Sequence, residues 1–170
     1  MKLTRQEFEA LISEMKQKDE RLELKDLDLS KLNLHRADLS WLILHRANLS
    51  GADLHRANLK RAVLEAANLQ GTALSGANLN GTNFKEADLS LTDMTKANLK
   101  WASLYEANLY RACLIGTNLE GADLSRANLR RTNFQWANLQ WAEVDHAEYD
   151  QETVWPDEFD PQAGGAVFVA

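Results

Sequence analysis

Residues 34–59 read LHRADLSWLILHRANLSGADLHRANL, and a leucine stands at every fifth position within them. The register extends in both directions, so that every fifth residue from Leu24 to Tyr149 is apolar, which makes 26 positions without an insertion. Leucine fills 21 of these positions, and the others are Phe84, Met94, Phe134, Val144 and Tyr149. Alanine usually stands two residues before the apolar residue, so the repeating unit is A-[ND]-L-x-x.

A period of five suits neither regular secondary structure. On an α-helix, five steps of about 100° leave successive leucines rotated by roughly 140°, so no apolar stripe forms. On an extended strand, an odd step sends successive leucines to opposite faces. Alanine and leucine of one unit do point the same way, so the remaining two residues must turn the chain. Glycines 51, 71, 76, 81, 116 and 121 all fall at the last position of a unit, where a turn accepts positive φ.

The repeat closely resembles that of the pentapeptide-repeat family, and the resemblance runs from residue 22 to residue 151. It implies an all-β solenoid, a right-handed quadrilateral β-helix with one unit on each side and hence four units in each coil. We therefore expect a capping helix in residues 1–21, the β-helix in 22–151 and a capping tail in 152–170. The threonines at alanine positions should be interior hydroxyls bonded to carbonyls, namely Thr72, Thr82, Thr92, Thr117 and Thr132. Asparagines 58, 78, 98, 118 and 138 should stack as an amide ladder.

Both ends of the repeat carry residues suited to closing a coil, whose unpaired strand groups would otherwise invite association. Thr4 and Glu7 form a capping box for a helix from about residue 5 to 19. Its apolar face contains Phe8, Leu11, Ile12 and Met15 and should lie over the first coil, where Leu22, Leu27 and Leu32 replace alanine. A membrane-surface helix is the alternative, weakened by acids on the polar face.

The tail keeps the five-residue phase at Val154 and Phe159 and then loses it. We expect Trp155, Phe159 and the final AVFVA to fold as a lid over the last coil. Dimerisation through that end is the alternative.

Charge and composition exclude several classes of protein. The net charge of −6 divides into 0 for residues 1–21, −1 for 22–149 and −5 for 150–170. A nearly neutral body does not steer the protein toward a polyion. The single cysteine, Cys113, cannot form an intrachain disulfide. The N-terminal residues do not read as a signal peptide and no stretch approaches the ~18 apolar residues of a membrane span, so we expect a cytoplasmic protein without a membrane partner.

The pair His-Arg recurs at 35–36, 45–46 and 55–56. With four units per coil, His35 and His55 stack on one side while His45 lies across the barrel, so the three imidazoles cannot share a zinc ion. Nucleic acid is not expected as a partner, because the arginines are spread around the sides and mixed with acids. We expect no metal or cofactor and assign these pairs to solvated turns.

Catalysis is not expected, because a register without insertions leaves no loop long enough to wall a pocket for a small-molecule substrate. Cys113 is interpreted as an inert surface thiol. The candidate interaction face is instead aromatic: Trp41, Trp101 and Trp141 differ by multiples of 20 and share a column with Arg61, while Trp136 lies one side away. Tryptophan and arginine are enriched at interface centres.

The sequence therefore favours a non-enzymatic scaffold that presents its sides to a protein partner, whose identity remains open. The alternative comes from the resemblance, since some pentapeptide-repeat proteins mimic duplex DNA and bind DNA gyrase. A mimic should carry a strongly acidic face, whereas residues 22–149 sum to only −1.

Overall fold

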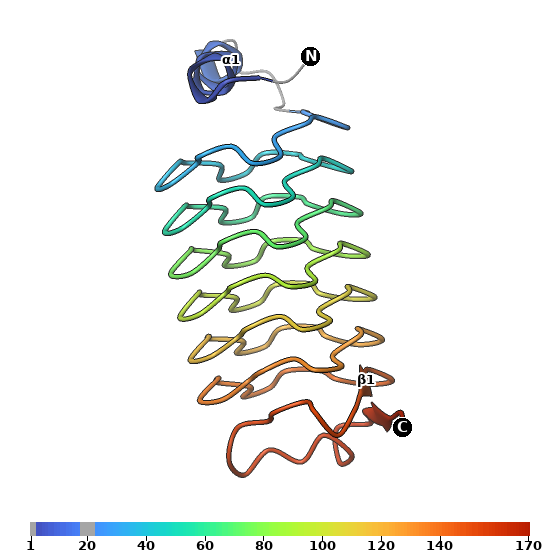
Figure 1. Cartoon of the computed structure of the whole chain (residues 1–170). Helices are drawn as coiled ribbons and strands as arrows, with labels where there is room; N and C mark the ends of the chain where they lie inside the picture. The colour runs from blue at the N-terminus through green and yellow to red at the C-terminus, as the bar shows by residue number, and fades with distance from the viewer. Residues whose placement is uncertain (1–2, 18–22) are drawn as a thin grey trace.

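The chain forms a stack of coils with a helix at one end and an irregular tail at the other (Figure 1). The structure, a computed structural model, describes residues 3–17 and 23–170. Its regular elements are helix α1 (Arg5–Gln17) and two short strands, β1 (Glu148–Tyr149) and β2 (Val167–Phe168). The rest of the ladder consists of single parallel bridges, because each side of a coil is too short to extend a strand.

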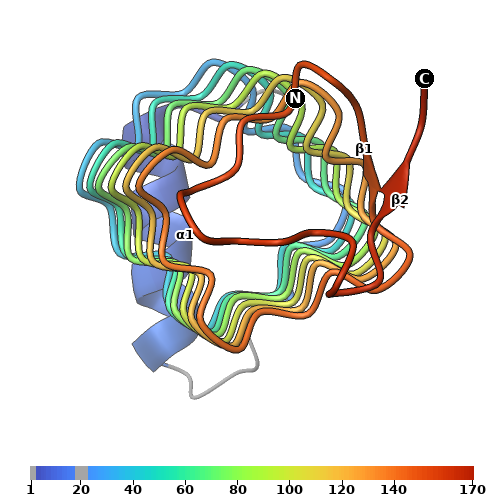
Figure 2. The same ribbon diagram turned by 90° about the horizontal axis from the view of Figure 1, so that it is seen from below.

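Each coil consists of four units, one on each of its four sides (Figure 2). Parallel bridges join positions 20 apart without exception from the pair Glu23–Ile43 to the pair Asn128–Glu148. At the corners, the N–H of the alanine donates back to the preceding leucine carbonyl, as from Ala37 to Leu34 at 2.9 Å. The expected fold class, a quadrilateral β-helix with an N-terminal helix, is confirmed.

The axis of the coil is filled by the apolar residue of each unit, and most of these side chains are completely buried. The five threonines at alanine positions are buried as expected, and each hydroxyl donates to a leucine carbonyl. Thr72, for example, donates to the carbonyl of Leu49 at 2.9 Å. Each interior hydroxyl is therefore satisfied, which avoids a penalty of about 1–3 kcal/mol for an unpaired group.

The amide ladder is confirmed in part. The Nδ2 of Asn78 donates to the Oδ1 of Asn58 at 3.0 Å, and Asn138 donates likewise to Asn118 at 3.3 Å. Asn98 interrupts the ladder, because among the described residues its side chain bonds only to the N–H of Lys100, at 3.2 Å. A second ladder, which the sequence analysis missed, runs from Asn128 through Asn108 to the carboxylate of Asp88.

The last position of every unit from residue 26 to residue 146 has a positive φ. Six of these 25 positions are glycine and the other nineteen are not, so glycine marks only a minority of the turns. Positive φ at the third residue of a hydrogen-bonded turn is the geometry of a type II turn. A residue with a side chain costs about 1 kcal/mol or more there relative to glycine. The side chains at these corners therefore do not stabilise the backbone conformation of the turn.

Helix α1 covers the first coil. The N–H of Thr4 donates to Glu7 Oε2 at 2.7 Å and the N–H of Glu7 to Thr4 Oγ1 at 3.3 Å, which is the expected capping box. Hydrogen bonds from the Thr4 N–H and hydroxyl lower the pKa of Glu7. Phe8 and Ile12 are buried against the core, and Leu11 and Met15 pack beside them. The expected helix end near 19, Leu22 and the boundary at 21–22 lie outside the described residues.

The tail departs from the expected phase. Asn133 pairs with Val154, one position further along the chain than the regular register would place its partner, so Val154 points outward and is 43% exposed. Trp155 takes the axial place and stacks on Phe134 with ring centroids 4.9 Å apart, and Phe159 stacks on Trp155 at 5.1 Å. One extra residue in this coil therefore shifts Val154 off the axis. Trp155 and Phe159 cover the last coil as expected, whereas Val167 and Phe168 of the final AVFVA pair beside β1 and are 43% and 50% exposed.

Asp150 stabilises the turn that holds this extra residue. Its Oδ1 accepts hydrogen bonds from the N–H groups of Arg131 and Glu152 and from the Thr153 hydroxyl, at 3.0–3.1 Å. Burial raises the pKa of Asp150, but these hydrogen bonds outweigh it and hold the pKa below the usual value. The chain then crosses the end of the barrel, and β2 pairs in parallel with β1, with Glu148 opposite Val167.

We expect Trp155→Phe to leave the melting temperature unchanged or higher. Trp155 Nε1 is buried without a hydrogen-bond partner among the described residues, and such a donor costs about 1–3 kcal/mol. Phenylalanine keeps an aromatic ring between Phe134 and Phe159 while removing that donor. Calorimetry provides the measurement. A clear loss of stability would mean that the indole area contributes more than the unpaired N–H costs.

Candidate interaction face

The structure places Trp41, Arg61, Trp101 and Trp141 at one corner of the coil. Backbone hydrogen bonds set the coil-to-coil step along this corner, as from the N–H of Trp41 to Lys60 and from the N–H of Trp101 to Glu120, both at 3.0 Å. Trp136 lies at the preceding corner. The exposed fractions are 60% for Trp41, 56% for Trp101, 71% for Trp136 and 67% for Trp141. We call Trp41, Arg61, Trp101 and Trp141 the tryptophan column.

Each tryptophan of the column occupies a left-handed turn position, with φ of 58–65°. Glycine occupies the same corner at positions 81 and 121, so the backbone turn at this corner does not require a side chain. Indole groups of this size bury little here and still carry the backbone cost. The backbone cost at these positions therefore offsets the stability that the packed part of each ring contributes.

Cations lie against two of the indoles. The guanidinium carbon of Arg61 is 4.9 Å from the Trp41 ring centroid, and Lys100 Nζ is 5.6 Å from that of Trp101. Lys100 is also paired with Glu120, at 2.7 Å. Cation–π contacts of this kind hold the rings in place at exposed sites with roughly 0.5–1 kcal/mol each.

Trp101 also depends on Gly121, one coil further along the column. A Cβ built on Gly121 would overlap the six-membered ring of Trp101, so the indole lies directly over the glycine backbone. We expect Gly121→Ala to displace this ring and to destabilise the protein by about 1–2 kcal/mol, since it adds a clash to the left-handed penalty.

Gly71→Ala is the matched control for that prediction. Gly71 has nearly the same φ, +64° against +65°, but nothing lies within 4 Å of its added Cβ. Chemical denaturation of both variants separates the backbone cost from the loss of Trp101 packing. Identical losses for the two variants would show that the indole does not rest on Gly121.

The His-Arg pairs form no metal centre in the part of the chain that the structure describes. His35 and His55 stack one coil apart, as expected, with ring centroids at 5.3 Å and planes 17° apart. Nδ1 of His55 lies 2.6 Å from the hydroxyl oxygen of Ser75, which is one coil further along the same corner. This imidazole is therefore already hydrogen-bonded within the protein. Cys113 is half-buried, with its sulfur 3.4 Å from the hydroxyl of Thr95.

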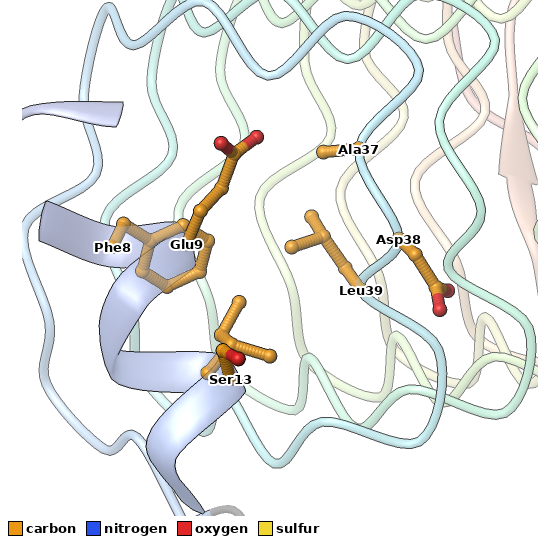
Figure 3. Close-up of a pocket in the computed structure, with 7 residues that line it drawn as sticks. Phe8, Glu9, Ser13, Ala37, Asp38 and Leu39 are labelled. Atoms are coloured by element: carbon orange, nitrogen blue, oxygen red, sulfur yellow. The ribbon is translucent and has the colours of Figure 1, made fainter. Parts of the chain in front are cut away.

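A cavity of about 450 Å³ lies between α1 and the first complete coils (Figure 3). Phe8 and Glu9 of the helix face Ala37 and Leu39 across it, whereas Asp38 points away. Apart from Asp38, its lining combines apolar side chains with the Glu9 carboxylate and the Ser13 hydroxyl, without an imidazole that could activate the serine. The cavity is therefore interpreted as imperfect packing of the helix on the coil.

The sequence analysis overlooked one exposed apolar residue, Leu91. It lies at a left-handed corner with φ 60° and is 51% exposed. Its signal in the sequence was an aliphatic residue at the last position of a unit, where glycine or a polar residue usually stands. Among the described residues, no helix is long and apolar enough to cross a membrane.

Comparisons with known proteins identify relatives of the fold. A sequence model described as pentapeptide repeats, in eight copies, matches residues 23–61, 43–81, 72–109, 82–121 and 107–143. No curated protein matches the chain at a significant level.

Three solved structures illustrate the similarity. HetL from the cyanobacterium Nostoc sp. strain PCC 7120, involved in heterocyst differentiation regulation, is 25% identical over 82% of this chain and 92% of its own, with a TM-score of 0.36. The Nostoc protein alr5209 is 31% identical over 69% and 84%, with a TM-score of 0.30. QnrB1, a plasmid-mediated fluoroquinolone resistance protein, is 20% identical over 86% and 82%, with a TM-score of 0.41.

The family matches together span residues 23–143, which is well over half of the 170 residues. Within this span the coils repeat every four units and bury one apolar side chain per unit. The chain therefore belongs to the pentapeptide-repeat family, whose fold is the right-handed quadrilateral β-helix.

Proposed function

We propose that this protein is a non-enzymatic scaffold whose tryptophan column binds a protein partner. The observation that carries the proposal is three indoles, each more than half exposed, at left-handed turn positions of a single corner. Glycine would suit these positions better and would not place an apolar ring in water. A binding role accounts for side chains that folding does not require.

The column suits a protein partner in shape and spacing. At the ~4.8 Å separation of neighbouring strands, Trp41 and Trp101 lie about 14 Å apart and Trp101 and Trp141 about 10 Å apart. The hydrogen-bonded ladder between them places their backbone positions in one column. Exposed tryptophans beside Arg61 and Lys100 resemble the aromatic and cationic centres of protein interfaces.

The test is capture of partners from the source cell by the purified protein and by a variant with Trp41, Trp101 and Trp141 changed to glycine. Glycine fits the positive φ, so the variant should melt at the same temperature or higher. We expect a partner retained by the original protein to be lost, because each buried interface tryptophan can contribute ~2 kcal/mol or more.

A matched control changes His35, His45 and His55 to serine. These residues also lie in turns but on other corners, so capture should persist. Retention of every partner by the tryptophan variant, or loss in the histidine variant alone, would contradict the proposal.

Mimicry of DNA is the second candidate, and the charge pattern does not favour it. Residues 22–149 hold 14 bases and 15 acids, and ion pairs such as Arg46–Asp26 and Arg126–Glu106 interleave the two signs on one corner. A row of carboxylates that mimics the phosphates of DNA needs acids that are not paired with bases. We expect the purified protein to leave DNA gyrase supercoiling and its inhibition by fluoroquinolones unchanged, and clear inhibition or drug protection would support mimicry instead.

A further inference from the structure

One side of the last complete coil ends in an open sheet edge. In the coil before it, the N–H groups of Gly116, Leu119 and Gly121 donate to carbonyls of the next coil at 2.8–2.9 Å. The corresponding groups one coil later belong to Trp136, Leu139 and Trp141. These three N–H groups have no acceptor within hydrogen-bond distance among the described residues. They form a row that can receive a further strand.

The edge is open because the tail leaves the wall. Val154 pairs with Asn133, and pairing resumes only where the His146 N–H donates to Gly165, at 2.9 Å. Between these points the chain crosses the opening of the barrel (Figure 2). The side from residue 136 to residue 141 therefore has no strand beneath it.

A groove of about 470 Å³ lies between this side and the crossing tail. Residues 137–140 line one wall and residues 156–159 the other. Ala137, Leu139, Pro156 and Phe159 supply apolar surface, which favours a bound chain over free water. Trp136 and Trp141 lie at the two corners that bound this side, and both are largely exposed.

The second wall is acidic. Asp157 and Glu158 line the groove, and the segment 150–170 contains five acids and no base. A basic segment is the complement of this charge. Lysine or arginine side chains near the ends of the groove could also contact the faces of Trp136 and Trp141.

We propose that this groove binds a basic, extended segment of a partner protein, which adds to the open edge as a parallel strand. Its carbonyls accept from the N–H groups of Trp136, Leu139 and Trp141, and one of its N–H groups donates to the Ala137 carbonyl. This repeats the coil-to-coil pattern, in which the Asn58 N–H donates to Ala37 at 2.9 Å. The inference rests on the proposed role in protein binding and places a second contact at the end of the rod.

A second copy of the chain fits the groove less well. End-to-end contact through two such tails would bring segments of charge −5 together. The opposite end of another copy is covered by α1. A basic peptide avoids both obstacles.

The probe is a blocked heptapeptide of alternating lysine and valine, compared with its glutamate counterpart at low salt. We expect the lysine peptide to bind and to slow hydrogen exchange at the N–H groups of Trp136, Leu139 and Trp141 by tenfold or more. Amide exchange reports strand addition directly, since charge attraction alone does not protect these groups.

The variant Asp157→Asn with Glu158→Gln should weaken binding about fivefold to tenfold, as two exposed charge pairs would. Its control, Glu65→Gln with Glu86→Gln, changes net charge equally at a distant corner and should bind normally. Binding without protection of the three N–H groups, or equal losses in both double variants, would overturn the proposal. So would protection that rises with protein concentration in the absence of peptide, which would indicate a dimer.

The two proposals can fail separately. If the Asp157 and Glu158 variant keeps its peptide affinity while the Trp41, Trp101 and Trp141 variant loses its partner, the groove is refuted and the column stands. If the peptide binds as described but partner capture survives loss of the column, the column is refuted and the groove stands.

Discussion

Removal of residues 151–170 is expected to make the rod associate with other copies of itself. Without the tail, the apolar axis would be exposed at Phe134, Leu139 and Tyr149, and β1 would lose its partner β2. Newly exposed sheet edges and apolar surface both promote association between copies. Light scattering of the truncated protein should show growth in particle size with concentration.

The control for this truncation is the full-length Trp155→Phe variant, which keeps the tail in place and should scatter like the original protein. A truncated protein that stays monomeric across the same concentrations would show that the tail does not protect the last coil.

Phe84→Ala is expected to lower the free energy of unfolding by about 3–5 kcal/mol. Phe84 is completely buried on the axis in the middle of the rod, so its removal leaves a cavity that neighbouring coils cannot close without moving the ladder. Urea denaturation followed by circular dichroism measures the loss.

Leu91→Gly provides the contrast, only a short way further along the chain. Leu91 is half-exposed at a left-handed corner, so glycine should stabilise the protein by about 1 kcal/mol. Comparable losses for the two changes would contradict the assignment of inward and outward positions.

The sequence was sufficient to predict the coil because its constraint repeats without interruption. A leucine at every fifth position permits an inward face only if each unit turns the chain, and this holds for Leu54 as it does for Leu124. The number of units in each coil came from the resemblance to the pentapeptide-repeat family, and the alignment of Trp41 with Trp101 and Trp141 followed from that number. The buried threonine hydroxyls followed from the requirement that interior donors be satisfied.

The end of the rod could not be predicted in the same way. Val154 is apolar and in phase, yet Trp155 takes the axis, because a stack of Phe134, Trp155 and Phe159 buries more aromatic surface. The extra residue depends on the hydrogen bonds of Asp150, which the local sequence does not distinguish from any other turn acid. The open edge at Leu139 arises because the tail leaves the wall after Val154, so it became visible only in three dimensions.

Chemical footprinting of the tryptophans tests the account most directly. The protein is captured with its partner from the source cell and oxidised, and the modification of each indole is measured by mass spectrometry against the free protein. We predict that Trp41, Trp101 and Trp141 are protected in the complex, while the tyrosines at other corners, Tyr105 and Tyr110, are oxidised equally in both samples. Unchanged oxidation of the three tryptophans, with protection of Tyr105 or Tyr110 instead, would contradict the assignment of the tryptophan column as the binding face.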